Sequence, residues 1–144
     1  MDLRIVATQA DLDAALRVRH EVFVEEQGVS PSLEIDEFDQ LNAATHAIAS
    51  RDGQIVAAGR LRMIDANSGK LERLAVLASE RAQGAGRALT LLLEGIAKDR
   101  GCAQMLLNSQ QSARGFYEKL GYIAHGDPFV EAGIDHIAMR KTLR

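Results

Sequence analysis

The segment ERAQGAGR, residues 80–87, combines residue types that bind phosphate. Arg81 and Arg87 flank Gly84 and Gly86 where an apolar run gives way to helical periodicity. A helix N-terminus presents unpaired amide donors and the positive end of the helix dipole, and a glycine lets a ligand approach because it has no Cβ. Arginine adds charge-assisted hydrogen bonds to phosphate oxygens. The segment therefore predicts an anion cradle suited to a pyrophosphate.

Two common phosphate-binding motifs do not occur in this sequence. A nucleoside-triphosphate P-loop needs Gly-Lys followed by Ser or Thr, and a dinucleotide fingerprint needs a third glycine where this chain has Leu89. Instead, Arg81-x-x-Gly84-x-Gly86 is followed by Asn108 and then by ARGFYEKLGY, residues 113–122. This combination resembles the GNAT superfamily of acetyl-CoA-dependent N-acetyltransferases, and the resemblance covers most of the chain.

The resemblance implies where acetyl-CoA would bind. The loop and first helical turn would hold its pyrophosphate through backbone amides, and the preceding strand would pair with the pantetheine arm. The Val76 amide would donate to the thioester carbonyl, an oxyanion-type contact. Asn108 would bond the pantetheine amides, with a strand-end or helix-capping asparagine as an equal alternative. The implied coenzyme-binding residues are Leu74, Ala75, Val76, Arg81, Gly84, Ala85, Gly86, Arg87, Ala88 and Asn108.

Tyr117 matches the position of the family's usual general acid, which protonates the departing thiolate of coenzyme A. A phenol with a pKa near 10 is protonated at neutral pH and is suited to this step. Packing in the core beside Phe116 is the alternative interpretation of Tyr117. The lone Cys102 follows the helix-ending Gly101, far along the chain from the cradle, and is interpreted as a small buried thiol rather than an acyl carrier.

A general base is also needed, because an ammonium group must lose a proton before its nitrogen can attack. Glu72 is the first candidate, since it lies on the strand that leads into the cradle. Its alternative role is an ion pair with a nearby arginine. The candidate partners are Arg60, Arg62 and Arg73, and the weaker candidate bases are His46, Glu131 and His136.

Charge is unevenly distributed along the chain. The net charge is −3 and the pI about 5.8, which argues against a nucleic-acid binder that relies on positive potential. Residues 20–39 contain seven acidic residues and no Lys or Arg. This segment is either a solvated loop, the commoner outcome, or a collar that attracts a cationic acceptor.

Short apolar runs alternate with helical periods along the sequence, a pattern typical of an α/β fold. The resemblance implies an α/β (α+β) fold with a mixed, mostly antiparallel sheet of six or seven strands and about four helices. Residues 28–42 are predicted to be irregular. The pattern predicts strands over 3–8, 44–50, 54–63, 71–77 and 105–108 and a final pair within 129–143. It predicts helices that begin after Thr8 and over 85–100 and 112–120.

The length of 144 residues predicts a single domain, and the resemblance implies that residues 1–144 form an N-acetyltransferase domain. No apolar run approaches a membrane span and the N-terminus lacks a signal-peptide pattern, so we expect a cytoplasmic protein without membrane, nucleic-acid or metal partners. The expected reaction moves the acetyl group of acetyl-CoA directly to a primary amine, in a small molecule or a protein lysine. The alternative is a non-catalytic acyl-CoA sensor. The acceptor's identity, the use of other acyl groups and a homodimer are left open.

Overall fold

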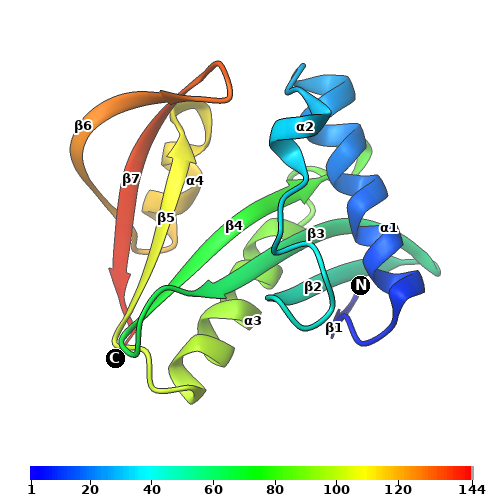
Figure 1. Cartoon of the computed structure of the whole chain (residues 1–144), viewed down its shortest axis with the longest axis horizontal. Coiled ribbons are helices and arrows are strands. Elements are labelled where there is room, and N and C mark those ends of the chain that lie inside the picture. Colours follow the sequence, from blue (N-terminus) through cyan, green and yellow to red (C-terminus); the bar gives the residue numbers. More distant parts are fainter. Residues whose placement is uncertain (144) are drawn as a thin grey trace.

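The computed structural model describes residues 1–143 and contains one seven-stranded sheet with helices on both faces (Figure 1). The strand order is β1-β2-β3-β4-β5-β7-β6. The strands are β1 (Asp2–Ile5), β2 (Thr45–Arg51), β3 (Gln54–Met63), β4 (Ser68–Val76), β5 (Gln104–Gln110), β6 (Ile123–Glu131) and β7 (Ile134–Thr142). The helical segments are α1 (Gln9–Arg19), η1 (His20–Glu26), α2 (Pro31–Glu34), η2 (Ala78–Glu80), α3 (Ala85–Asp99), η3 (Gln111–Ala113) and α4 (Arg114–Lys119). The predicted fold class is confirmed.

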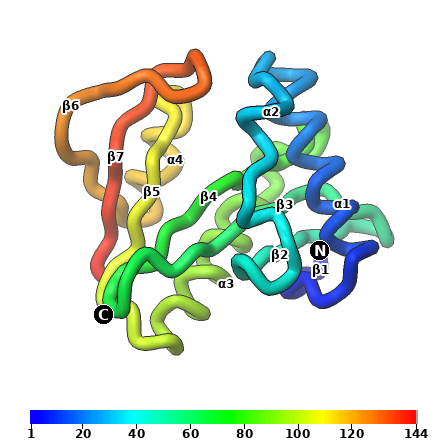
Figure 2. The backbone as a smooth tube through the Cα atoms, in the orientation of Figure 1, coloured from blue at the N-terminus to red at the C-terminus, as the bar shows by residue number. Residues whose placement is uncertain are grey.

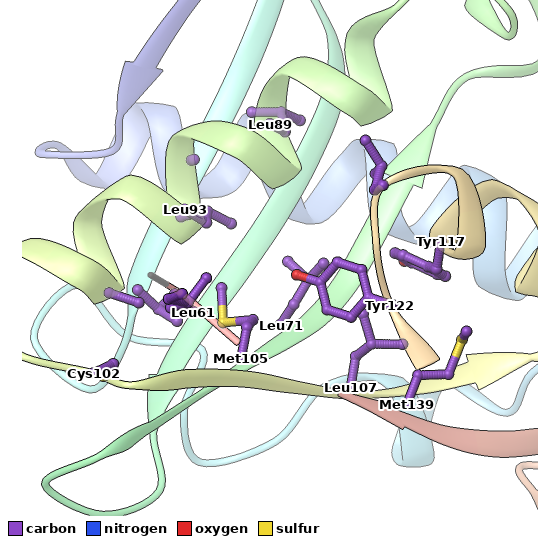
Figure 3. Close-up of a cluster of buried hydrophobic side chains, with 14 of the residues drawn as sticks. Leu61, Leu71, Leu89, Leu93, Cys102, Met105, Leu107, Tyr117, Tyr122 and Met139 are labelled. Atoms are coloured by element: carbon purple, nitrogen blue, oxygen red, sulfur yellow. The ribbon is translucent and has the colours of Figure 1, made fainter. Parts of the chain in front are cut away.

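Alternating side chains of the strands supply two cores. On β2, Ala47 and Ala49 pack in the large cluster with α3, whereas Ile48 packs with Leu12 of α1. The apolar stripe predicted on α3 faces the sheet, because Leu89 and Leu93 are fully buried. Figure 3 shows both leucines above the methionine and leucine side chains of the central strands. Tyr117 and Tyr122 lie at one end of the cluster.

The N-terminal helix begins as predicted and continues differently. The Thr8 hydroxyl accepts a hydrogen bond from the Asp11 amide at 3.2 Å, which fixes the start of α1 and limits β1 to residues 2–5. After Arg19 the chain continues as the π-helical segment η1. Within the stretch predicted to be irregular, residues 31–34 form the short helix α2, with Pro31 at the start, where proline needs no amide donor. That part of the prediction was wrong.

The central strands β4 and β5 separate, and this shapes the site. Among residues 1–143 they are the one parallel pair of strands, and they are bonded only over Ser68–Leu71 and Gln104–Leu107. Figure 2 shows the two strands diverging beyond this point. Arg60 of β3 faces Glu72 of β4 and Ala58 of β3 faces Ala75 of β4, so between these pairs two β4 residues oppose one β3 residue. This β-bulge, with Arg73 at a φ of 56°, bends β4 at the start of the divergence.

Candidate active site

A cavity of about 870 Å³ occupies the space between the diverging strands. Its walls come from η1, β4, the start of α3, the end of β5, α4 and the turn between β6 and β7. Most of the predicted coenzyme-binding residues and both predicted catalytic residues line this cavity. Those that line it are Leu74, Val76, Arg81, Gly84, Ala85, Gly86, Arg87, Asn108, Glu72 and Tyr117.

The start of α3 presents unpaired backbone donors to the cavity. Gly84 precedes the helix at a φ of 91°, a conformation that favours glycine, and no side chain caps this end. The Ala88 amide donates to the Gly84 carbonyl at 3.0 Å, the first hydrogen bond within the helix. The donors open to an anion are therefore those of residues 84–87. The amide of Ala88, which the sequence placed among them, is already satisfied.

Gly86 keeps the cradle open and also permits close packing. A Cβ at this position would lie 3.3 Å from Phe116 Cζ and 3.5 Å from Val76 Cγ2. The glycine therefore lets the first turn of α3 approach both α4 and β4. The sequence predicted a glycine here because its backbone must be open to a ligand. The close approach of Phe116 is a second reason why this position needs a glycine.

The two arginines of the cradle differ in their partners. Arg81 forms two hydrogen bonds to the Glu26 carboxylate, at 2.5 and 2.6 Å, and its Nε donates to the Val76 carbonyl at 3.2 Å. Arg87 lines the cavity, is exposed and forms no salt bridge within residues 1–143. Arg87 is therefore the more accessible cation for a phosphate, because Arg81 must first leave Glu26.

The open edge of β4 carries one of the predicted amide donors. The Leu77 amide donates to Val56 of β3 at 3.0 Å, and amides alternate in direction along a strand. The Val76 amide and carbonyl consequently face the cavity, where Arg81 already bonds the carbonyl. The Ala75 amide faces β3 instead, and its side chain packs with Val18 and Val22, so Ala75 does not line the cavity.

Tyr117 is both packed in the core and part of the cavity wall. The side chain is 8% exposed and lies edge-on to Phe116 and Tyr122. Burial raises the pKa of the Tyr117 phenol above its usual range, so the phenol keeps its proton at neutral pH. Within residues 1–143, neither the Tyr117 hydroxyl nor the Asn108 side chain has a hydrogen-bond partner. Both are therefore available to a ligand in the cavity.

Glu72 lies in the cavity wall but is held by cations. Its carboxylate accepts hydrogen bonds from Arg60 and Arg62, each at 3.0 Å, and lies 3.7 Å from Lys70. Burial alone would raise the Glu72 pKa, but the hydrogen bond from Arg62 and the three positive charges lower it below its usual value. The ion-pair role, stated from the sequence as the alternative, is the arrangement present here, and it makes Glu72 a weak proton acceptor.

The other candidate bases separate into two groups. His46 Nε2 lies 3.2 Å from the carbonyls of Phe38 and Gln40, away from the cavity lining. Glu131 and His136 both line the cavity, at the turn between β6 and β7. Both were the weaker candidates from the sequence, where a lone strand histidine is more often structural than catalytic.

The acidic residues of the segment 20–39 are largely used inside the protein. Arg19 bonds Glu34 and Asp39 at 2.7 and 2.6 Å, and Arg60 bonds Asp36 and Asp39 at 2.7 and 2.9 Å. We call these five side chains the arginine–carboxylate network. With Glu26 bound to Arg81, four of the seven acidic residues have arginine partners. The segment is therefore neither the solvated loop nor the open acidic collar considered from the sequence.

Two glutamines that the sequence analysis did not single out join opposite walls of the cavity. Gln110 at the end of β5 donates to Gln27, just after η1, at 2.8 Å. The two residues are 83 positions apart, so only the folded chain brings them together. Cys102 is buried. No helix among residues 1–143 is long and apolar enough to cross a membrane, and the same residues contain no cluster suited to a metal ion.

The fold that surrounds this cavity is that of an acyltransferase. Residues 11–143 match the acetyltransferase (GNAT) domain, and the chain belongs to this family. The Bacillus subtilis protein YyaT is 40% identical over 144 residues, covering 99% of this chain and 97% of YyaT. The uncharacterised B. subtilis N-acetyltransferase YjcF is 41% identical over 138 residues, covering 95% and 96% of the two chains. The resemblance noted from the sequence is thereby confirmed.

Solved structures share the fold over the whole chain. An acyl-CoA N-acyltransferase from Pseudomonas aeruginosa superimposes with a TM-score of 0.83 at 30% identity, covering 97% of this chain and 98% of that one. An aminoglycoside 6'-N-acetyltransferase in complex with coenzyme A has a TM-score of 0.80 at 17% identity, covering 100% and 98%. The second likeness concerns the fold alone.

Proposed function

We propose that this protein transfers the acetyl group of acetyl-CoA to a primary amine by direct attack within a ternary complex. The observation that carries the proposal is that an anion cradle, the Val76 amide and the Tyr117 phenol all face the same cavity. A phosphate-bearing thioester needs all three, because one group must hold its anion, one must polarise its carbonyl and one must protonate its sulfur. A sensor domain would need only the first.

Each residue has a distinct role in this reaction. Amides of residues 84–87 and the Arg87 guanidinium hold the pyrophosphate. The edge of β4 at Leu74 and Val76, together with the Asn108 side chain, bonds the pantetheine arm. The Val76 amide donates to the acyl oxygen and strengthens as negative charge develops there. The thioester supplies an activated acetyl carbon when bound.

The proton needed by the leaving sulfur comes from Tyr117. Its raised pKa keeps the phenol protonated, and its hydroxyl has no competing acceptor among residues 1–143. A phenol at this position can donate as the bond between carbon and sulfur breaks.

We infer that the acceptor is a cationic amine bound at Glu131. Of the cavity carboxylates, Glu34 pairs with Arg19, Glu72 with Arg60 and Glu80 with Arg51. Glu131 has no arginine or lysine partner within residues 1–143 and is 52% exposed. It can therefore attract a cation without first losing an internal ion pair. This replaces the acidic segment as the reason to expect a cationic acceptor.

The function is tested by measuring acetyl-CoA-dependent thiol release with a panel of cationic amines and with Tyr117→Phe. The variant keeps the ring but removes the proton donor, so coenzyme A should bind unchanged while kcat falls by about 10²- to 10⁴-fold. Tyr122→Phe is the matched control, because Tyr122 bonds Glu94 at 2.7 Å and does not line the cavity.

Full kcat in Tyr117→Phe would remove Tyr117 from the mechanism. A wild-type protein that binds coenzyme A but acetylates no amine in the panel would instead support the sensor alternative.

A further inference from the structure

His136 lines the cavity from β7. It faces Gln110 directly across β5 and β7, and directly opposed residues of an antiparallel pair lie on one face of the sheet. Gln110 bonds Gln27, next to η1, so this is the face covered by α1 and η1. Tyr117 comes from the opposite face, where α4 packs in the cluster with α3. The cavity therefore holds an ionisable imidazole and a phenol supplied from opposite faces of the sheet.

The His136 ring is held in one orientation and one tautomer. Its Nδ1 lies 2.7 Å from the Ile134 carbonyl, which can only accept, so Nδ1 carries a proton in both charge states. The ring stacks on Phe129 with 5.8 Å between centroids and 23° between planes. Proton exchange is consequently confined to Nε2.

One carboxylate faces Nε2. Glu131 Oε2 lies 3.6 Å from Nε2, and an imidazolium there would form an ion pair with this carboxylate. The neighbouring elements β5 and η3, QMLLNSQ and QSA, contain no charged residue. Charged side chains elsewhere in the cavity lining are Glu34, Lys70, Glu72, Arg73, Glu80, Arg81 and Arg87. The three carboxylates among them, Glu34, Glu72 and Glu80, have arginine partners. Glu131 is therefore the carboxylate that faces His136.

We propose that His136 Nε2 is the general base that takes the proton from the acceptor ammonium, and that Glu131 stabilises the resulting imidazolium. This rests on the proposed function. One N–H bond of the ammonium breaks and its proton moves to Nε2, leaving a lone pair on nitrogen. That lone pair forms the bond to the acyl carbon, the carbon–sulfur bond breaks, and sulfur takes the Tyr117 proton.

The proton balance closes through solvent. A second proton lost by the new amide nitrogen restores the Tyr117 phenol through water. His136 passes its proton by way of the half-exposed Glu131 to solvent. Each turnover therefore releases one proton, together with free coenzyme A and the acetylated amine.

His136→Asn tests this proposal. Asparagine keeps a donor that can reach the Ile134 carbonyl but has no basic atom in place of Nε2. With an amine of pKa near 10, we expect kcat/KM at pH 7 to fall by about 10²- to 10⁴-fold with unchanged coenzyme A affinity. The loss should shrink as pH rises toward the pKa of the amine. A weakly basic amine, already neutral at pH 7, should lose little. His125→Asn is the control, since His125 is exposed and outside the cavity lining.

Glu131→Gln provides a second measurement on an exposed residue, where folding is not at risk. It should raise KM for cationic amines and leave weakly basic amines unaffected. Equal losses for basic and weakly basic amines in His136→Asn would mean that His136 only supports the hairpin, and an unchanged pH profile would also overturn the proposal. Both results leave amine acetylation itself intact, whereas a wild type inactive with every amine would refute the proposed function.

Discussion

Asp39 gives the sharpest test of how the arginine–carboxylate network supports the fold. Its side chain is 2% exposed and accepts hydrogen bonds from Arg19 and Arg60. Burial alone would raise its pKa, but the hydrogen bonds from Arg19 and the Asp36 amide, with the charges of both arginines, lower the pKa from 3.8 to about 2. At about 1.4 kcal/mol per pKa unit, this difference stabilises the folded state by about 2.5 kcal/mol near neutral pH.

The sign of the pH dependence follows from the lowered pKa. The folded state holds the Asp39 proton less tightly than the unfolded state, so its contribution is complete above about pH 5 and is lost as pH falls to about 2. Asp39→Asn removes this contribution. Urea unfolding should therefore show a deficit of about 2.5 kcal/mol for the variant at pH 7 that disappears near pH 2.

Asp127→Asn is the control for this measurement, because Asp127 is exposed and forms no salt bridge within residues 1–143. Its unfolding free energy should follow that of the wild type at every pH. A deficit of Asp39→Asn that stays constant from pH 7 to pH 2 would refute the argument, since the stabilisation would then not depend on the ionised carboxylate.

Two further predictions concern the cradle. Gly86→Val should weaken coenzyme A binding by about tenfold, because a side chain there displaces Phe116 and covers the backbone donors. Gly95→Val, at an open position of α3, is the control and should leave the affinity unchanged. Calorimetry with coenzyme A measures both affinities. Glu26→Gln should strengthen coenzyme A binding by about two- to fivefold, because it frees Arg81 for the pyrophosphate. Unchanged affinity in Glu26→Gln would mean that Arg81 stays on Val76 and does not bind the ligand.

The parts of the site that sequence predicted are those fixed by neighbours along the chain. Gly84 and Gly86 mark the start of α3 because a helix N-terminus has local signals, and Gly84 indeed has a positive φ. Tyr117 follows from a short motif on one helix. Even here the local pattern did not resolve which amides are free, since Ala88 is the first residue bonded within the helix and Ala75 faces β3.

The parts that sequence did not predict depend on distant residues. The sequence named Arg60, Arg62 and Arg73 as candidate partners of Glu72 but could not choose among them. The register of β3 and β4 is shifted by a bulge at Arg73, a residue type that gives no sign of a positive φ. Arg60, which bonds both Asp36 and Asp39, lies 24 and 21 positions away from them along the chain. Composition showed an excess of acid in the segment 20–39 but could not show that arginines of α1 and β3 neutralise it.

The same arginine–carboxylate network holds in place the cavity wall at α2, which we call the acceptor wall because it lies with α1 and η1 on the face that carries His136. Arg19 anchors Glu34 at the end of α2, and Arg73 of the bulge donates to the Glu34 carbonyl at 3.0 Å. Helix α2, only four residues long, cannot be stable on its own, so these bonds fix it against β4. Leu33 and Glu34 line the cavity, so loss of the network at low pH should loosen the acceptor wall. The cradle of α3 lies outside the network and should keep its geometry. Acid should therefore impair acceptor binding before coenzyme A binding.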